Sequence, residues 1–277
     1  MLKVYLVQMD SAKGSKSENL AKTRKMILDA YPAEGSLILL PEMFATGYLP
    51  ASLDKEAEDF STNTSGETAH ILSEIANATN CTLMGAGITR AANGFFNHVS
   101  IYEPGNTQEA AGYNKMNLFF PERGDFKPGT NVNLFNIKEI PACAGMTENA
   151  NWKIATFICY DLRFPEIFRE ATKQGANLIT IQAAWPAKRR AHWETLLKAR
   201  AIENQVYIAA VNGVSTNAQS KAPLAGTSLI VTPNGDILAA GNDLEEAVIY
   251  AELDMQAEKN YRKSFPVLDG IVPPDLI

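Results

Sequence analysis

Hydrophobic and polar positions along this chain repeat with two periods, one typical of strands and one typical of helices. Short apolar runs bounded by Gly, Pro or polar residues predict buried strands. We expect strands at Leu2–Met9, Ser36–Leu40, Thr82–Ile88, His98–Tyr102, Glu109–Tyr113, Val132–Ile137, Trp152–Ile158, Asn177–Gln182, Val206–Val211, Thr227–Val231 and Ala247–Leu253. Pro104-Gly105-Asn106 and Asn234-Gly235 predict hairpin turns, the second between the last two of these strands.

Four other segments have the apolar spacing of amphipathic helices, and two of these segments begin with the spacing of a capping box. The helices are expected from Ser15/Glu18 to about Tyr31, from Thr64/Glu67 onward, over Pro165–Gln174 and over Arg189–Gln205. Strands alternate with helices at both ends of the chain, and hairpins lie between. This order predicts one α/β domain over residues 1–277, with helices covering sheets.

Two segments fall outside that regular order. Glu139–Asn151 is small, polar and without a period, which predicts a surface excursion. From about residue 262 we expect a C-terminal tail. The chain shows no internal repeat and no low-complexity linker.

Composition narrows the classes of function. The net charge is −6, and the longest basic run is Lys188-Arg189-Arg190, so binding to nucleic acid or an anionic membrane surface is not expected. No apolar stretch approaches the length of a membrane helix or a signal peptide. The three cysteines, Cys81, Cys143 and Cys159, are few and odd in number, which argues against disulfides and favours a cytoplasmic location.

Three reactive side chains each follow an apolar strand. Glu42 lies among Leu, Pro, Met and Phe, and partial desolvation of a carboxyl raises its pKa toward values useful for proton transfer. Lys115 precedes Met116 and could pair with carboxylates and stabilise an oxyanion. Cys159 lies between a strand and a helix start, which exposes a nucleophile. Each residue taken alone would more often be structural: an outward carboxylate, a lysine on a loop, a buried thiol.

A cysteine nucleophile needs a partner that stabilises its thiolate or takes its proton. His70, His98 and His192 are the histidines of the chain, and none has a setting that singles it out as a base. A Lys cation with a Glu base meets the same need, although no spacing rule proves that the three segments meet. A Cys–His hydrolase therefore remains an alternative. We find no His/Cys metal-ligand cluster and no phosphate-binding Gly motif, so no metal or cofactor is expected.

Three strings occur in order over the chain, and together they resemble the nitrilase superfamily of carbon–nitrogen hydrolases. The strings are Pro41-Glu42, Tyr113-Asn114-Lys115 and Ile158-Cys159-Tyr160-Asp161-Leu162-Arg163-Phe164-Pro165-Glu166. The resemblance implies a four-layer αββα sandwich that pairs into a larger dimeric sandwich, as a homodimer or a higher homo-oligomer. It also implies a catalytic trio of Glu42, Lys115 and Cys159, with Glu122 as a supporting acid and the backbone N–H of Tyr160 at the oxyanion. The other reading of Glu122 is an exposed loop acid.

Further strings are similar to the omega-amidase branch of that superfamily: Ala184-Trp185-Pro186-Ala187, His192-Trp193, Ala199–Gln205 and Tyr261–Pro266. A Tyr follows the Cys, where nitrilases usually carry Trp-Glu, so nitrile hydrolysis is disfavoured. The branch implies that a thioester on the Cys forms while ammonia is released from a small-molecule dicarboxylate monoamide of the 2-oxoglutaramate or succinamate type.

Such a substrate needs a cation for its distal carboxylate. Arg163 and Arg123 lie in suitable segments, although either could be structural. Trp185 is a candidate cavity wall or a core aromatic. The alternatives for the whole chain are another amidase, an amide-exchange acyltransferase on the same trio, or a non-catalytic interaction protein.

Overall fold

The strands form two sheets of six. The computed structural model describes residues 1–11, 15–60, 66–138, 151–217, 220 and 222–271. The first sheet has the order β12-β1-β2-β3-β4-β5. Its strands are β1 Leu2–Gln8, β2 Leu37–Glu42, β3 Thr82–Ala91, β4 Gly94–Tyr102, β5 Ala111–Asn114 and β12 Ala247–Leu253. The second sheet has the order β11-β10-β9-β8-β7-β6. Its strands are β6 Leu134–Lys138, β7 Asn151–Ile158, β8 Leu178–Ala183, β9 Tyr207–Asn212, β10 Leu229–Val231 and β11 Ile237–Ala240.

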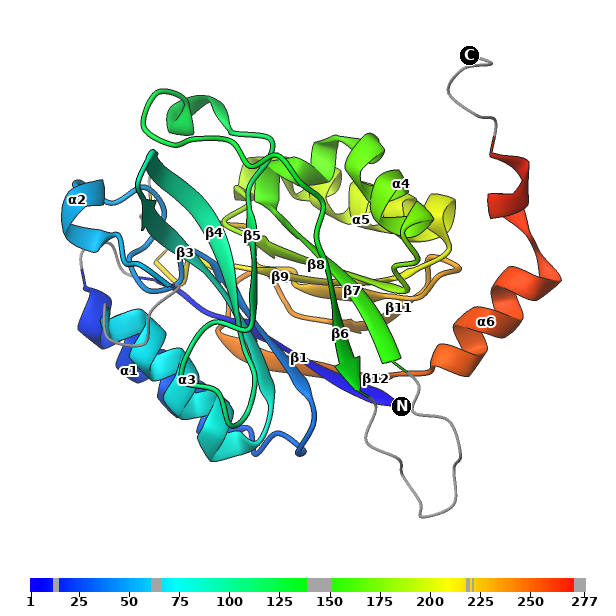
Figure 1. Ribbon diagram of the computed structural model, residues 1–277, viewed down its shortest axis with the longest axis horizontal. Helices are drawn as coiled ribbons and strands as arrows, with labels where there is room; N and C mark the ends of the chain where they lie inside the picture. Colours follow the sequence, from blue (N-terminus) through cyan, green and yellow to red (C-terminus); the bar gives the residue numbers. More distant parts are fainter. Residues whose placement is uncertain (12–14, 61–65, 139–150, 218–219, 221, 272–277) are drawn as a thin grey trace.

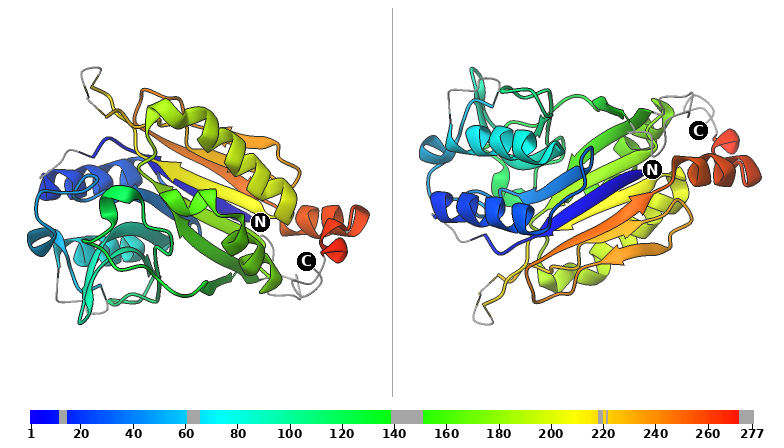
Figure 2. Two further views of the ribbon diagram at one scale, coloured as in Figure 1. Left: turned by 90° about the horizontal axis from the view of Figure 1, so that it is seen from above. Right: turned by 90° about the horizontal axis from the view of Figure 1, so that it is seen from below.

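The two sheets pack face to face, and helices cover their outer faces (Figures 1 and 2). Helices α1 (Lys16–Asp29) and α3 (Glu67–Thr79) lie on the first sheet, and α4 (Pro165–Lys173) and α5 (Arg190–Asn204) on the second. The predicted four-layer αββα architecture is confirmed. Within each sheet the central strands are parallel and the outer ones antiparallel.

Strand β2 shows why the central strands are apolar on both faces. Leu37 and Leu39 belong to the core between the two sheets. Ile38 and Leu40 belong to the core that also contains side chains of α1 and α3. Because both faces of the strand are covered, its sequence is a continuous apolar run and does not alternate with polar residues. This run ends at Glu42, the last residue of β2.

The prediction for the strand after Asn234-Gly235 is wrong. That turn joins β10 to β11, and the structure pairs these two strands antiparallel. Strand β12, which we expected as the partner, instead pairs with β1 in the other sheet. Strand β11 lies at a sheet edge, and three of its four residues are exposed. It therefore lacks a buried apolar stripe, and the sequence pattern did not predict it.

The capping predictions are also corrected. Helix α1 begins after Ser15, but the Ser15 side chain makes no capping hydrogen bond. Helix α3 begins at Glu67, with Gly66 at the N-cap. The carboxylate of Glu58 accepts hydrogen bonds from the backbone N–H groups of Thr68 and Ala69. A distant acid thus takes the role expected of Thr64, a residue that lies outside the described ranges.

The C-terminal part holds a helix that the sequence analysis did not predict, α6 (Met255–Ser264), which extends away from the sandwich (Figure 1). The tail expected from about residue 262 therefore starts inside α6. A short helix α2 (Leu53–Glu56) and a 3-10 turn at Val267–Gly270 were not expected either. The excursion at Glu139–Asn151 lies outside the described residues apart from Asn151, where β7 begins. Among the helices described, none is long and apolar enough to cross a membrane.

Candidate active site

The three reactive residues meet at one end of the sandwich. Glu42 ends β2, Lys115 directly follows β5, and Cys159 directly follows β7. Glu42 and Lys115 thus come from the first sheet and Cys159 from the second. The ammonium Nζ of Lys115 lies 2.8 Å from Oε1 of Glu42, and the charges of both residues act on the thiol of Cys159.

Lys115 holds two buried carboxylates. Its Nζ also donates to Oε1 of Glu122 at 2.9 Å, and neither of these two residues is exposed to solvent. Burial would lower the pKa of Lys115, but the negative charges of Glu42, Cys159 and Glu122 raise it above its ordinary value, so the ammonium stays charged. Glu122, for which an exposed loop position was the other reading, is buried in this cluster. Burial raises its pKa, and the Lys115 ammonium opposes that rise.

Both carboxylates accept further hydrogen bonds from fixed donors. Nδ2 of Asn97, on β4, lies 2.7 Å from Oε1 of Glu42 and 2.7 Å from Oε1 of Glu122. The second oxygen of Glu42 accepts from the backbone N–H of Ala184 at 3.0 Å. The second oxygen of Glu122 accepts from the backbone N–H of Phe119 at 2.6 Å. The orientation of each carboxylate is thereby fixed on both of its oxygens.

Cys159 occupies a strained turn between strand and helix. Its φ is 44°, in the left-handed region that non-glycine residues seldom adopt. Only 8% of the residue is exposed. Burial, followed by the negative charge of Glu42, raises the pKa of the thiol well above its usual range, and Lys115 lowers it. The resting group is therefore a thiol beside an acceptor for its proton.

Asp161 joins the turn that carries Cys159 to the loop that carries Lys115. Its carboxylate accepts from the hydroxyl of Tyr113 at 2.8 Å, from the backbone N–H of Asn117 at 2.8 Å and from that of Ile158 at 3.1 Å. The residue is fully buried, and burial raises the pKa of its carboxyl. No role was expected for Asp161, although an acid inside an apolar string was a signal for one. Asn97 was missed because the expected strand began at His98.

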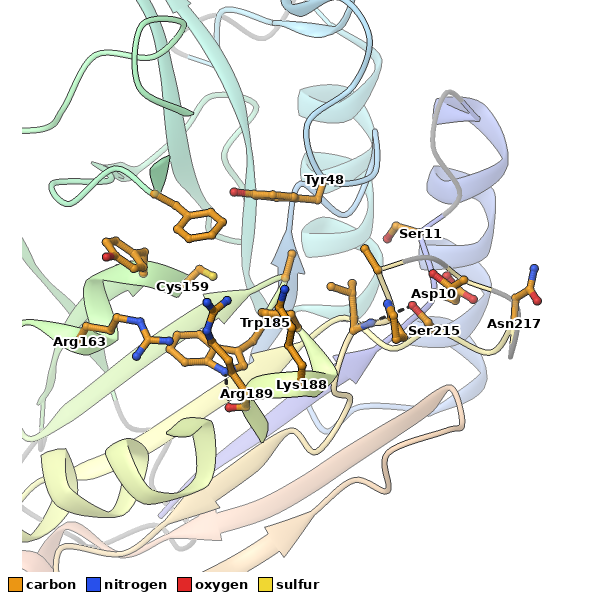
Figure 3. A pocket seen from close by; sticks show the side chains of 18 of the residues that line it. Asp10, Ser11, Tyr48, Cys159, Arg163, Trp185, Lys188, Arg189, Ser215 and Asn217 are labelled. Atoms are coloured by element: carbon orange, nitrogen blue, oxygen red, sulfur yellow. Dashed lines mark hydrogen bonds between the residues drawn. The ribbon is translucent and has the colours of Figure 1, made fainter. Parts of the chain in front are cut away.

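A cavity of about 870 Å³ opens beside Cys159 (Figure 3). Aromatic side chains form much of its wall: Tyr48, Phe119, Tyr160 and Trp185. Trp185 was expected to be either a cavity wall or a core aromatic. It is both, because it lines the cavity and is only 1% exposed. Its backbone N–H donates to Oδ1 of Asn212 and its indole N–H to the carbonyl of Arg189, so this wall is fixed.

Of the residues described, four cations and one acid line the same cavity (Figure 3): Arg163, Lys188, Arg189, Lys22 and Asp10. Lys22 pairs with Glu246 at 2.8 Å, which leaves Arg163, Lys188 and Arg189 as the three to consider. The guanidinium of Arg163 lies 4.5 Å from the ring centroid of Trp185. Burial, and next the positive charge of Arg189, lower the pKa of Arg163. Within the described ranges no ion pair joins a carboxylate to any of the three, whereas the adjacent Arg190 pairs with Asp243 at 2.7 Å. The cavity therefore offers positive charge to a bound anion.

Arg123 lies apart from the residues that line this cavity. It is exposed, its guanidinium stacks 5.0 Å from the ring centroid of Phe120, and it is not among the residues that line the cavity. The histidines do not support a Cys–His pair. His98 uses both ring nitrogens, on Asn114 and Glu109. His70 and His192 are exposed. In the part of the chain that the structure describes, no group of three or more His, Cys, Asp or Glu side chains is placed to hold a metal ion.

Comparison with known proteins shows the family. The sequence model of the carbon–nitrogen hydrolases matches residues 3–263. A 2-oxoglutaramate amidase of Bacillus subtilis (strain 168) is 32% identical over 271 residues, 97% of this chain and 96% of that protein. The omega-amidase YafV of Escherichia coli (strain K12) is 33% identical over 233 residues, 83% of this chain and 82% of that protein.

A solved structure gives the same answer. A CN-hydrolase superfamily protein of Xanthomonas campestris, with an arsenic adduct in its active site, has a TM-score of 0.82 and 28% identity and covers 98% of both chains. The match to this structure and the match to the Bacillus subtilis relative both cover nearly the full length of this chain. This chain therefore belongs to the carbon–nitrogen hydrolase family and is a hydrolase of carbon–nitrogen bonds other than peptide bonds.

Proposed function

We propose that this protein is an omega-amidase that hydrolyses a dicarboxylate monoamide of the 2-oxoglutaramate or succinamate type through a thioester on Cys159. The observation that carries the proposal is the 2.8 Å contact between Lys115 and Glu42 beside Cys159. The cavity there is lined by Arg163, Lys188 and Arg189, and among the described residues no carboxylate forms an ion pair with these three. The names of the two sequence relatives support the substrate class.

In the first half of the reaction Sγ of Cys159 attacks the amide carbon while Glu42 takes the thiol proton. The Lys115 ammonium and the backbone N–H of Tyr160 stabilise the oxyanion, and a donor of this kind typically contributes about 3 kcal/mol. The carbon–nitrogen bond then breaks. Glu42 returns its proton to the leaving nitrogen, so that ammonia departs and a thioester remains.

In the second half Glu42 removes a proton from water, and the resulting hydroxide attacks the thioester carbon. The carbon–sulfur bond breaks, the acid product leaves, and the proton returns to Sγ. Glu42 acts as base and then as acid in each half, which suits a carboxylate whose two oxygens are fixed by Lys115, Asn97 and the N–H of Ala184. Such acid–base help typically contributes on the order of 10²–10⁴-fold.

The distal carboxylate of the substrate binds the cations of the cavity. Arg163 is held by Trp185 and Tyr160, whose ring centroids lie 4.5 and 5.6 Å from its guanidinium. It is therefore oriented before the substrate arrives, with Arg189 close enough to act on its charge. The aromatic walls suit the methylene carbons between the amide and the carboxylate.

The test is ammonia release by the purified protein and by Cys159→Ala. The panel contains succinamate, 2-oxoglutaramate, glutamine, asparagine, a carbamoyl-β-alanine and a simple nitrile. The proposal expects release from the two monoamides, and none from the variant. If ammonia release stops at one equivalent per protein while mass spectrometry shows an acyl group on Cys159, water does not accept the acyl group, and transfer to another amine is favoured over hydrolysis. If neither is seen, the proposed activity is wrong and a non-catalytic role is favoured.

A further inference from the structure

One buried amide bridges the two carboxylates of the site. Nδ2 of Asn97 lies 2.7 Å from Oε1 of Glu42 and 2.7 Å from Oε1 of Glu122. Nζ of Lys115 contacts the same two oxygen atoms at 2.8 and 2.9 Å. The four atoms form a closed ring in which donors and acceptors alternate.

The orientation of the Asn97 amide follows from its neighbours. The reverse orientation would direct its carbonyl oxygen at two carboxylate oxygens, which are acceptors as well. In the observed orientation Oδ1 of Asn97 is buried and, among the described residues, has no hydrogen-bond partner. An unsatisfied buried carbonyl is unfavourable, so the two N–H contacts must outweigh that loss.

The ring bears on the protonation of the site. Two carboxylates share one ammonium, which leaves an excess negative charge where water is excluded. Two acids in such a place commonly retain one proton between them. The amide of Asn97 contacts both Oε1 atoms, where a proton shared between the two acids would lie, and it donates to the ionised form of both.

We infer that Asn97 is a positioning residue that keeps Glu42 and Glu122 ionised together, and so keeps Glu42 ready to take the thiol proton of Cys159. The inference rests on the catalytic roles proposed above for Glu42 and Cys159. The other titratable groups around the ring are Cys159, Tyr48 and Asp161. Burial raises the pKa of Tyr48, so its hydroxyl stays protonated, but within the described residues it makes no hydrogen bond to Glu42 or Glu122. Asp161 accepts its hydrogen bonds elsewhere, so neither supplies the donor that Asn97 provides.

The test compares Asn97→Leu and the isosteric Asn97→Asp with the wild-type protein. Without the amide donors one carboxyl should hold a proton to higher pH, so the acid limb of kcat/KM should move up by on the order of one pH unit. The loss of kcat/KM in each variant, relative to the wild type, should become smaller as the pH rises. In Asn97→Leu the retained proton also removes one negative charge beside Cys159, so alkylation by iodoacetamide at the low pH where that proton is held should be faster than in the wild type and should converge with it as the pH rises, because both carboxylates raise the pKa of that thiol.

His98→Leu is the matched control. His98 is the next residue on β4, is nearly as buried, and also makes two short hydrogen bonds, but to Asn114 and Glu109. Neither pH profile should move in this variant. If folded Asn97→Leu loses the same factor of kcat/KM at every pH and keeps the wild-type alkylation profile, the inference is wrong. Alkylation requires no substrate, so it tests Asn97 even if the proposed amidase activity fails.

Discussion

The hydroxyl of Tyr113 donates to Oδ2 of Asp161 at 2.8 Å, and this hydrogen bond joins the strand before Lys115 to the turn that begins at Cys159. Removing the hydroxyl in Tyr113→Phe should therefore loosen the geometry of the trio. We expect kcat to fall about tenfold, and the free energy of unfolding to fall by about 1.5–3 kcal/mol, because the acceptor is charged and buried. The measurements are steady-state kinetics and denaturant unfolding.

Tyr102→Phe is the control for that variant, since among the described residues the hydroxyl of Tyr102 makes one long contact, at 3.5 Å with the carbonyl of Phe60. It should leave kcat close to that of the wild type. Equal losses of kcat in both variants would show that the link to Asp161 has no special part in the site.

Glu42→Gln should have opposite effects on turnover and on ionisation of the Cys159 thiol. Without the base, kcat should fall on the order of 10²–10⁴-fold. The negative charge of Glu42 raises the pKa of Cys159, so its removal should lower that pKa, and the pH midpoint of alkylation by iodoacetamide should move down. A midpoint that moves up instead would mean that Glu42 is not the charge acting on the thiol.

Arg189→Met and Arg163→Met should weaken the binding of substrates that carry a distal carboxylate. A charge-assisted hydrogen bond is worth about 1.5–3 kcal/mol, so KM for succinamate should rise about 10- to 100-fold. Butyramide, which has no carboxylate, should lose little in kcat/KM. Arg190→Met is the matched control, because Arg190 pairs with Asp243 and does not line the cavity. An unchanged KM in both cavity variants would refute this assignment.

Gly129→Ala should displace the backbone of Lys115, although Gly129 is not itself a site residue. The N–H of Gly129 donates to the carbonyl of Lys115 at 2.8 Å, and a Cβ at Gly129 would overlap the carbonyl oxygen of Asn114. The backbone beside Lys115 must then shift, at about 1–3 kcal/mol of stability, and kcat should fall as well. Gly270→Ala, where a Cβ meets nothing within 4 Å, should change neither the melting temperature nor kcat. A Gly129→Ala protein with wild-type kcat would show that the loop adapts freely.

Sequence periodicity predicted an α/β domain with helices covering sheets because most of the elements are strongly patterned, and the order of four layers came from the resemblance to the nitrilase superfamily. The continuous apolar run of Leu37–Leu40 and the amphipathic pattern of α5 report burial directly, and burial decides these elements. Strand β11 is an edge strand with mostly exposed residues, so it has no buried apolar stripe. Helix α6 is held by contacts with distant parts of the chain, such as the hydrogen bonds from Arg262 to the carbonyls of Gln205 and Ala176. The capping of α3 by Glu58 depends on a loop that returns to the helix, which no local spacing reveals.

The candidate site also contains residues that local sequence patterns predicted and residues that they did not. Glu42, Lys115 and Cys159 were found because each follows an apolar strand and because the strings around them are distinctive. Asn97 was not found because its partners lie 55 and 25 residues away in the sequence. The sequence also could not show that Arg189 lines the cavity and Arg123 does not, since this depends on the folded arrangement of the side chains.

The proposed base and the proposed nucleophile stand on different sheets, Glu42 on the first and Cys159 on the second. More than a hundred residues of chain separate them. The distance over which the proton moves therefore depends on how the layers of Leu, Ile and Phe between the sheets interlock. A displacement of about 1 Å can slow a reaction about 10²-fold. Variants that trim this interior far from the cavity should therefore lose turnover while the protein is still folded, so the interior is a working part of the catalyst as well as its support.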